Sequence, residues 1–74
     1  MNEKAIMVKE PHIIRGRIGW QFREVSREDA VRWARILWNA PGLKALPEKR
    51  RAEHIRFNFI RGTLVTMDEM RRRP

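Results

Sequence analysis

The sequence predicts a small single domain of the α+β class, with a short antiparallel β-sheet of two or three strands packed against two helices and a disordered basic C-terminus. Three observations predict this class. The chain has 74 residues, which suits one domain. Apolar residues alternate with period two up to residue 25, as in strands, and then recur with period 3.6, as in amphipathic helices. We place the domain at residues 1–66 and a short helical or disordered basic tail at 67–74.

The sheet is expected in the first 25 residues. An apolar run at residues 5–8 is interrupted by Pro11, so two antiparallel strands joined around residues 10–12 are the simplest arrangement. In the stretch that follows, IIRGRIGWQFREV, the even positions from Ile14 to Phe22 are apolar or glycine, and three of the odd positions are arginine. This alternation predicts a strand with one apolar face against the core and one cationic face turned away from it.

A turn within this stretch, at Gly16 or Gly19, is the alternative. The apolar positions keep the same parity from Ile14 to Phe22. A two-residue hairpin loop would make facing residues differ in parity, so the pattern favours one strand bent at glycine.

The first helix is expected to begin after Ser26, which can cap it, with Asp29 at the third helical position. Val25 can pack against Ala30 as a hydrophobic staple, and residues 39–42 end the helix. Positions 100° apart place one apolar stripe toward the core: Ala30, Val31, Ala34, Leu37 and Trp38. Trp33, Ile36 and Ala40 lie outside that stripe, so this helix is either sandwiched in the domain or offers a second face to a partner.

A loop and a second helix follow, with Pro47 suited to the first helical position and Gly62 to the C-terminal stop. The stripe of this helix is Ala52, Ile55 and Phe59, whereas Phe57 and Ile60 lie off it. We expect helix to about residue 59. The sequence IRFNF also satisfies a strand alternation, so β-structure after His54 is the alternative.

A short helix can start at Thr66 with Glu69 as its capping partner. The terminal residues RRRP are expected to be disordered.

Charge is the most informative part of the composition. Seventeen Lys and Arg against nine Asp and Glu give a net charge of +8, and the pI is about 11.5. Nucleic acid or an acidic protein surface is therefore the expected partner. There is no cysteine, and no apolar run is long enough for a membrane span, so we expect a soluble, cytosolic protein, monomeric when free.

The residues needed for catalysis are scarce. The only serine, Ser26, is a candidate helix cap, and there is no cysteine or tyrosine. The two histidines, His12 and His54, are too far apart in sequence to make a good metal-ligand set. We therefore expect a protein that is not an enzyme and has no cofactor.

Two sets of residues are candidate binding residues. The partner-binding set combines arginines of the alternating strand with surplus apolar residues: Arg15, Arg17, Trp20, Arg23, Trp33 and Ile36. The nucleic-acid-binding set consists of cations on and after the second helix: Lys49, Arg50, Arg51, Arg56 and Arg61. The alternative to binding is that the arginines of the first set lie on a strand face exposed to solvent, and the cations of the second set on a helix face exposed to solvent.

The segments RGRIGWQFREVSREDA and LWNAPGLKALPE, in a small basic chain without cysteine, resemble the small regulators of bacterial RNA polymerase encoded by lytic phages of xanthomonads. This resemblance implies a transcription inhibitor and antiterminator that acts in the cytoplasm of the bacterial host. It implies binding to the N-terminal region of the polymerase β′ subunit and to the neighbouring β flap, at the RNA exit channel, where RNA can also be contacted. No individual contact residue is carried over from it.

Two alternatives remain open: a stand-alone DNA- or RNA-binding protein, and another small inhibitor directed at a host system, such as an anti-CRISPR. An apolar patch edged by arginine suits a protein partner better than a uniformly basic groove would.

Overall fold

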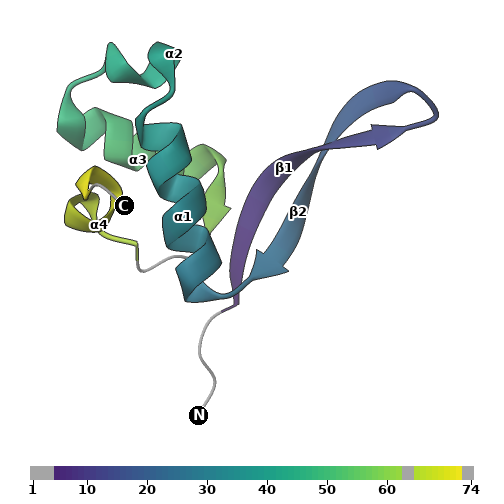
Figure 1. Cartoon of the computed structure of the whole chain (residues 1–74), viewed down its shortest axis with the longest axis horizontal. Helices are drawn as coiled ribbons and strands as arrows, with labels where there is room; N and C mark the ends of the chain where they lie inside the picture. The colour runs from purple at the N-terminus through teal and green to yellow at the C-terminus, as the bar shows by residue number, and fades with distance from the viewer. Residues whose placement is uncertain (1–4, 63–64, 73–74) are drawn as a thin grey trace.

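A computed structural model describes residues 5–62 and 65–72 of the chain. It confirms the α+β class. Three strands and four helices follow one another as β1 (Ile6–Ile14), β2 (Arg17–Val25), α1 (Arg27–Trp38), α2 (Pro41–Lys44), α3 (Glu48–Asn58), β3 (Ile60–Arg61) and α4 (Met67–Arg71). The antiparallel sheet has the order β2-β1-β3, and the two long strands leave the helices as a twisted ribbon (Figure 1).

The ribbon is a hairpin closed by Arg15 and Gly16, and this corrects two expectations. β1 runs without interruption through Pro11, and the chain reverses between Ile14 and Arg17, which face each other. Both loop residues have positive φ, 52° and 75°, as a type I′ turn requires. The expected turn around residues 10–12 and the expected single strand bent at glycine are therefore wrong.

Pro11 is tolerated inside β1 because of the side on which its nitrogen lies. The pair that closes a two-residue hairpin, Ile14 and Arg17, exchanges backbone hydrogen bonds, and such pairs alternate with non-bonded ones. Odd-numbered residues of β1 therefore point their backbone groups away from β2. Accordingly, the N–H of Lys9 donates to the carbonyl of Phe59 at 2.7 Å. At Pro11, beyond the end of β3, no described strand needs the missing donor.

The predicted core face of the ribbon is also wrong. Opposed residues of an antiparallel pair lie on one face, so Arg23 shares its face with the buried Val8. The even residues of β2 lie on the other face, opposite Lys9, Pro11 and Ile13. We call this second face the outer face; it carries Lys9, Pro11, Ile13, Ile18, Trp20, Phe22 and Arg61. The arginines of β2 thus lie on the same face as the buried Val8, and the aromatic residues of β2 lie on the opposite face.

Helix α1 confirms its predicted start. The hydroxyl oxygen of Ser26 accepts a hydrogen bond from the N–H of Asp29 at 3.2 Å, and Asn39 is the C-cap. Within the predicted stripe, Ala30, Val31, Ala34 and Trp38 are buried, and Leu37 is half-buried. Outside it, Trp33 is half-buried against the core, whereas Ile36 is exposed.

Helix α3 ends where the sequence predicts, but the two residues that were expected to begin and to stop it have other positions. Pro47 is the N-cap, not the first helical residue, and Phe59 is the C-cap. The strand alternative is wrong for IRFNF, because residues 55–58 are helical and a strand, β3, forms only from Ile60, which it places in the core. Gly62, with φ 69°, follows β3 and is therefore not a helix stop.

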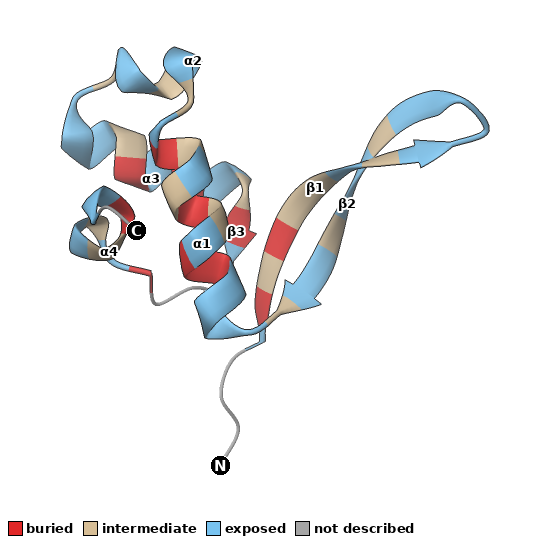
Figure 2. Cartoon of the chain, viewed as in Figure 1, coloured by how far each residue is buried: buried red, intermediate tan, exposed pale blue. Residues whose placement is uncertain are grey.

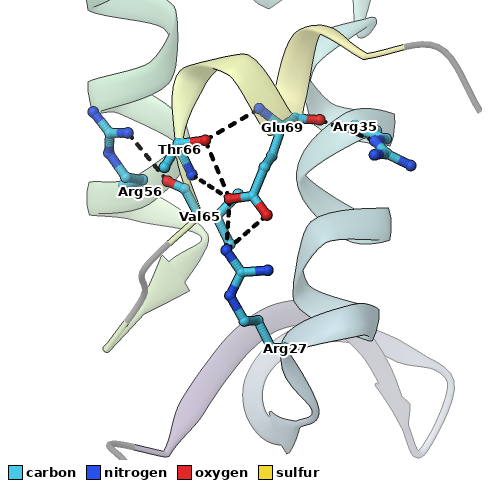
Figure 3. Close-up of polar contacts among 6 residues, drawn as sticks. All are labelled: Arg27, Arg35, Arg56, Val65, Thr66 and Glu69. Carbon is cyan, nitrogen blue, oxygen red and sulfur yellow. Dashed lines mark hydrogen bonds and ion pairs between the residues drawn. The ribbon is translucent and has the colours of Figure 1, made fainter.

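Helix α4 joins the core, since Met70 is fully buried. The predicted capping box is confirmed: the Thr66 hydroxyl accepts from the N–H of Glu69, and the Glu69 carboxylate accepts from the N–H of Thr66 at 2.9 Å. The same carboxylate pairs with Arg27 of α1 (Figure 3). The C-terminal segment is therefore helical over Met67–Arg71, and of the predicted disordered end, residues 73–74 lie outside the described part of the chain.

Stability is expected to depend on pH through Glu69. The hydrogen bond from the Thr66 N–H, followed by the contact with Arg27, lowers the pKa of Glu69 below its ordinary value of 4.5. The ionised form therefore favours the fold. Its contribution is complete above about pH 4.5 and is lost as the pH falls through the lowered pKa.

Glu69→Gln should therefore lower the thermal midpoint at pH 7, and the difference from the parent should narrow below about pH 4. Melting curves across this pH range measure it. Glu53→Gln, at an exposed position of α3, is the control and should change little. A difference between Glu69→Gln and the parent that is constant from pH 7 to pH 3 would contradict this account.

The core lies between α1, α3, α4 and the base of the sheet (Figure 2). It consists of Ile6, Val8, Ala30, Val31, Ala34, Trp38, Ala52, Ile55, Ile60, Val65 and Met70. Within the described chain, no hydrophobic residue of 9–24 belongs to it or packs against it. None of the helices described is long and apolar enough to cross a membrane.

Candidate partner-binding surface

The half of the hairpin farthest from the helices, residues 11–20, exposes large apolar side chains. Ile13, Ile14, Ile18 and Trp20 are 69%, 59%, 74% and 59% exposed. We call residues 11–20 the distal ribbon. At about 3.3 Å per residue, its paired strands extend roughly 15 Å beyond the base of the sheet, and Figure 1 shows them clear of the helices. A two-stranded hairpin that packs against nothing is marginally stable in water, so this arm is suited to contact with another molecule.

The distal ribbon is also cationic. It contains Arg15 and Arg17 and no Asp or Glu. Within residues 5–62 and 65–72, neither arginine pairs with a carboxylate, whereas Arg27, Arg32 and Arg71 on the helices do. The uncompensated positive charge therefore coincides with the exposed apolar side chains.

Two further cations lie over aromatic rings of the outer face. The Nζ atom of Lys9 is 5.2 Å from the ring centre of Trp20, and the guanidinium carbon of Arg61 is 4.4 Å from that of Phe22. Each of these two rings therefore has a cation over it. The outer face thus presents aromatic surface bordered by positive charge.

The predicted partner-binding residues divide into two groups. Arg15, Arg17 and Trp20 lie on the distal ribbon. Arg23, Trp33 and Ile36 line a small depression between the base of the ribbon and α1.

Within the second group, Arg23 is already occupied. Its Nε atom donates to the Glu10 carboxylate at 2.8 Å, and this hydrogen bond raises the pKa of Arg23. The structure therefore does not join the six predicted residues into one surface.

The predicted nucleic-acid-binding residues are dispersed as well. Arg51 lies over the Trp38 ring at 4.3 Å and donates to the carbonyls of Lys44 and Leu46. Arg56 donates to the carbonyl of Val65 at 3.2 Å (Figure 3). Arg61 belongs to the outer face of the sheet.

Lys49 and Arg50 are exposed on α3. Arg50, His54 and Phe57 line a shallow groove there, and Phe57 is 81% exposed. This groove places the exposed cation of Arg50 beside an exposed aromatic ring.

Sequence reasoning missed Ile13, Ile14 and Ile18 as binding residues. The signal that could have found them is the Arg15-Gly16 pair, read as a two-residue turn between apolar strands. Strands that pair all the way to a turn at this position reach beyond the part of the sheet that packs against the helices. The tip of the hairpin therefore extends past the core.

Among the described residues, no group of three or more His, Cys, Asp or Glu side chains is arranged to hold a metal ion. The expectation that the protein is not an enzyme stays a prediction. Comparison with known proteins adds no assignment, because no family model, no curated protein and no solved structure matches this chain.

Proposed function

We propose that this protein is a regulator that acts by binding another protein through its distal ribbon. The observation that carries the proposal is the set of four exposed large apolar side chains on an arm whose hydrophobic residues do not pack against the core in the described chain. Phosphate contact alone does not need such a cluster, whereas buried aromatic and arginine anchors dominate protein interfaces. Arg15 and Arg17 suit a partner surface with carboxylates at its rim.

The particular partner that we propose is bacterial RNA polymerase, on the ground of the resemblance to small phage regulators. Binding near the β′ N-terminus and the β flap, at the RNA exit channel, would inhibit initiation and promote antitermination. The distal ribbon would supply the apolar anchors, and its arginines would meet acidic protein or emerging RNA.

Trp20→Ala is expected to weaken binding to purified, nuclease-treated RNA polymerase about 30-fold, as the loss of a hot-spot residue does. The thermal midpoint should stay near that of the parent, because Trp20 is outside the core. Calorimetry of binding and of unfolding measures the two effects. The matched control is Ile36→Ala, which removes an equally exposed apolar side chain from α1.

Unchanged affinity of Trp20→Ala, or an equal loss with Ile36→Ala, would contradict the assignment to the distal ribbon. If the parent does not bind polymerase but binds naked RNA tightly at physiological salt, the second candidate function, nucleic-acid binding, replaces the first. The groove of Arg50, His54 and Phe57 favours that candidate, because single strands bind to cations interleaved with aromatic rings.

A further inference from the structure

We propose that the outer edge of β2 binds an extended segment of the partner protein as an additional β-strand, and that this segment alternates apolar and acidic side chains. The inference rests on the proposed function and adds how the ribbon recognises its partner. The geometry that points to it is the coincidence, on the same residues of β2, of backbone groups directed at an open edge and exposed apolar side chains.

The direction of the backbone groups follows from the hairpin register. Ile14 and Arg17 close the two-residue loop as a hydrogen-bonded pair, so the odd-numbered residues of β2 bond to β1. The even-numbered residues Ile18, Trp20, Phe22 and Glu24 therefore direct their N–H and C=O groups to the other side. Because the sheet order is β2-β1-β3, no described strand pairs there.

The opposite edge of the ribbon is less suited to strand addition. Along β1, the outward groups belong to odd residues, and those of Met7 and Lys9 face β3 and Phe59. The next outward residue is Pro11, which has no N–H to donate. β2 has no proline over its nine residues, so its edge presents a continuous series of donors and acceptors.

Side chains define the chemistry of the incoming strand. On the outer face it would lie beside Ile18, Trp20 and Phe22, so those positions of the segment should be apolar. On the inner face it would lie beside Arg17 and Arg23, which favours carboxylates there. This preference comes mainly from Arg17, which has no ion-pair partner in the described chain, because Arg23 already pairs with Glu10 although its side chain is 55% exposed.

Charge argues against a second copy of this chain as the occupant. Each copy carries a net charge of +8. Pairing two β2 edges with Trp20 opposite Trp20 would also place Arg17 opposite Arg23 of the other copy, and like charges directly opposed are destabilising. An acidic segment removes both penalties.

The first test uses a nine-residue acetylated peptide of alternating valine and aspartate, added to the isotope-labelled full chain. Amide hydrogen exchange followed by NMR should slow at Ile18, Trp20 and Phe22, and change little at Gly19 and Gln21, which already bond to β1. The control peptide replaces aspartate with lysine and should not protect these amides. Protection at both odd and even residues, or at none, would overturn the proposal.

The second test separates backbone recognition from side-chain contact. Trp20→Pro and Trp20→Ala both remove the indole ring, but only Trp20→Pro also removes an outward N–H. Peptide affinity should be about three- to tenfold lower for Trp20→Pro than for Trp20→Ala, the value of one hydrogen bond. Slow exchange at Gly19 and Gln21 reports that the hairpin persists, and Ile18→Pro with Ile18→Ala provides a second pair if it does not.

The outcomes distinguish this inference from the proposed function. Equal affinities of the Pro and Ala variants overturn strand addition, even if Trp20→Ala still weakens polymerase binding and so supports the distal ribbon. Amide protection that depends on protein concentration without peptide identifies a second copy as the occupant and also overturns it. If the parent does not bind polymerase but the peptide still protects the even residues, only the proposed function is overturned.

Discussion

Ile55→Ala is expected to lower the free energy of unfolding by about 2–5 kcal/mol, the range for removing a buried branched side chain and leaving a cavity. Ile55 is fully buried in the middle of α3. It packs in the core with Ala52 of the same helix and with residues of α1 and α4. A domain of this size has a total stability of about 4–11 kcal/mol. The variant should therefore melt far below the parent or fail to fold.

Phe57→Ala is the matched control, because it removes a larger side chain two residues further along the same helix. Phe57 is 81% exposed, so its replacement should change the unfolding free energy by about 0.5 kcal/mol or less. Urea unfolding of both variants measures the difference. Comparable losses of unfolding free energy would contradict the structure, in which Ile55 is buried and Phe57 is exposed.

Gly62→Ala is expected to destabilise the protein by at least about 1–2 kcal/mol, the cost of the left-handed conformation for a residue with a Cβ atom. Gly62 has φ 69°, and a Cβ atom built on it would collide with the backbone carbonyl of Ala5. Because a backbone atom is in the way, no side-chain rotation relieves the collision. The effect should exceed that of the conformation alone, and β3 should separate from the start of β1.

Gly42→Ala is the control for this second prediction. Gly42 lies in the short helix α2, and a Cβ atom there meets nothing within 4 Å. The substitution should leave stability unchanged or raise it by about 0.4–1 kcal/mol, through the lower entropy of the unfolded chain. If the backbone conformations of these two glycines are right, Gly62→Ala lowers the thermal midpoint and Gly42→Ala leaves it unchanged or raises it. Equal shifts of the two midpoints would contradict these conformations.

Part of the candidate surface was predictable from the residues. Arg15, Arg17 and Trp20 were predicted as binding residues and lie on the distal ribbon. Trp33 and Ile36 were placed in the same site from their position off the helix stripe, but they lie beside Arg23 at the base of the ribbon. Periodicity locates a residue on one element and contains no information about how far two elements extend past each other.

The sequence by itself determined where two helices of this protein begin. Ser26 and Thr66 begin helices because their hydroxyl oxygens accept bonds from N–H groups three residues later, an interaction within one turn. The apolar stripe of α1 and the class of the fold follow from periodicity for the same reason: the signal and the structure occupy the same short segment.

Only the tertiary structure decided which face of the ribbon meets the core. The alternation from Ile14 to Phe22 was compatible with an apolar face against the helices, yet the two-residue turn at Arg15 and Gly16 pairs Val8 with Arg23 and turns Trp20 outward. A shift of one residue in a hairpin exchanges its two faces completely. In the described part of the chain, no hydrophobic residue of 9–24 packs against the core, so the alternation there does not indicate which face is buried.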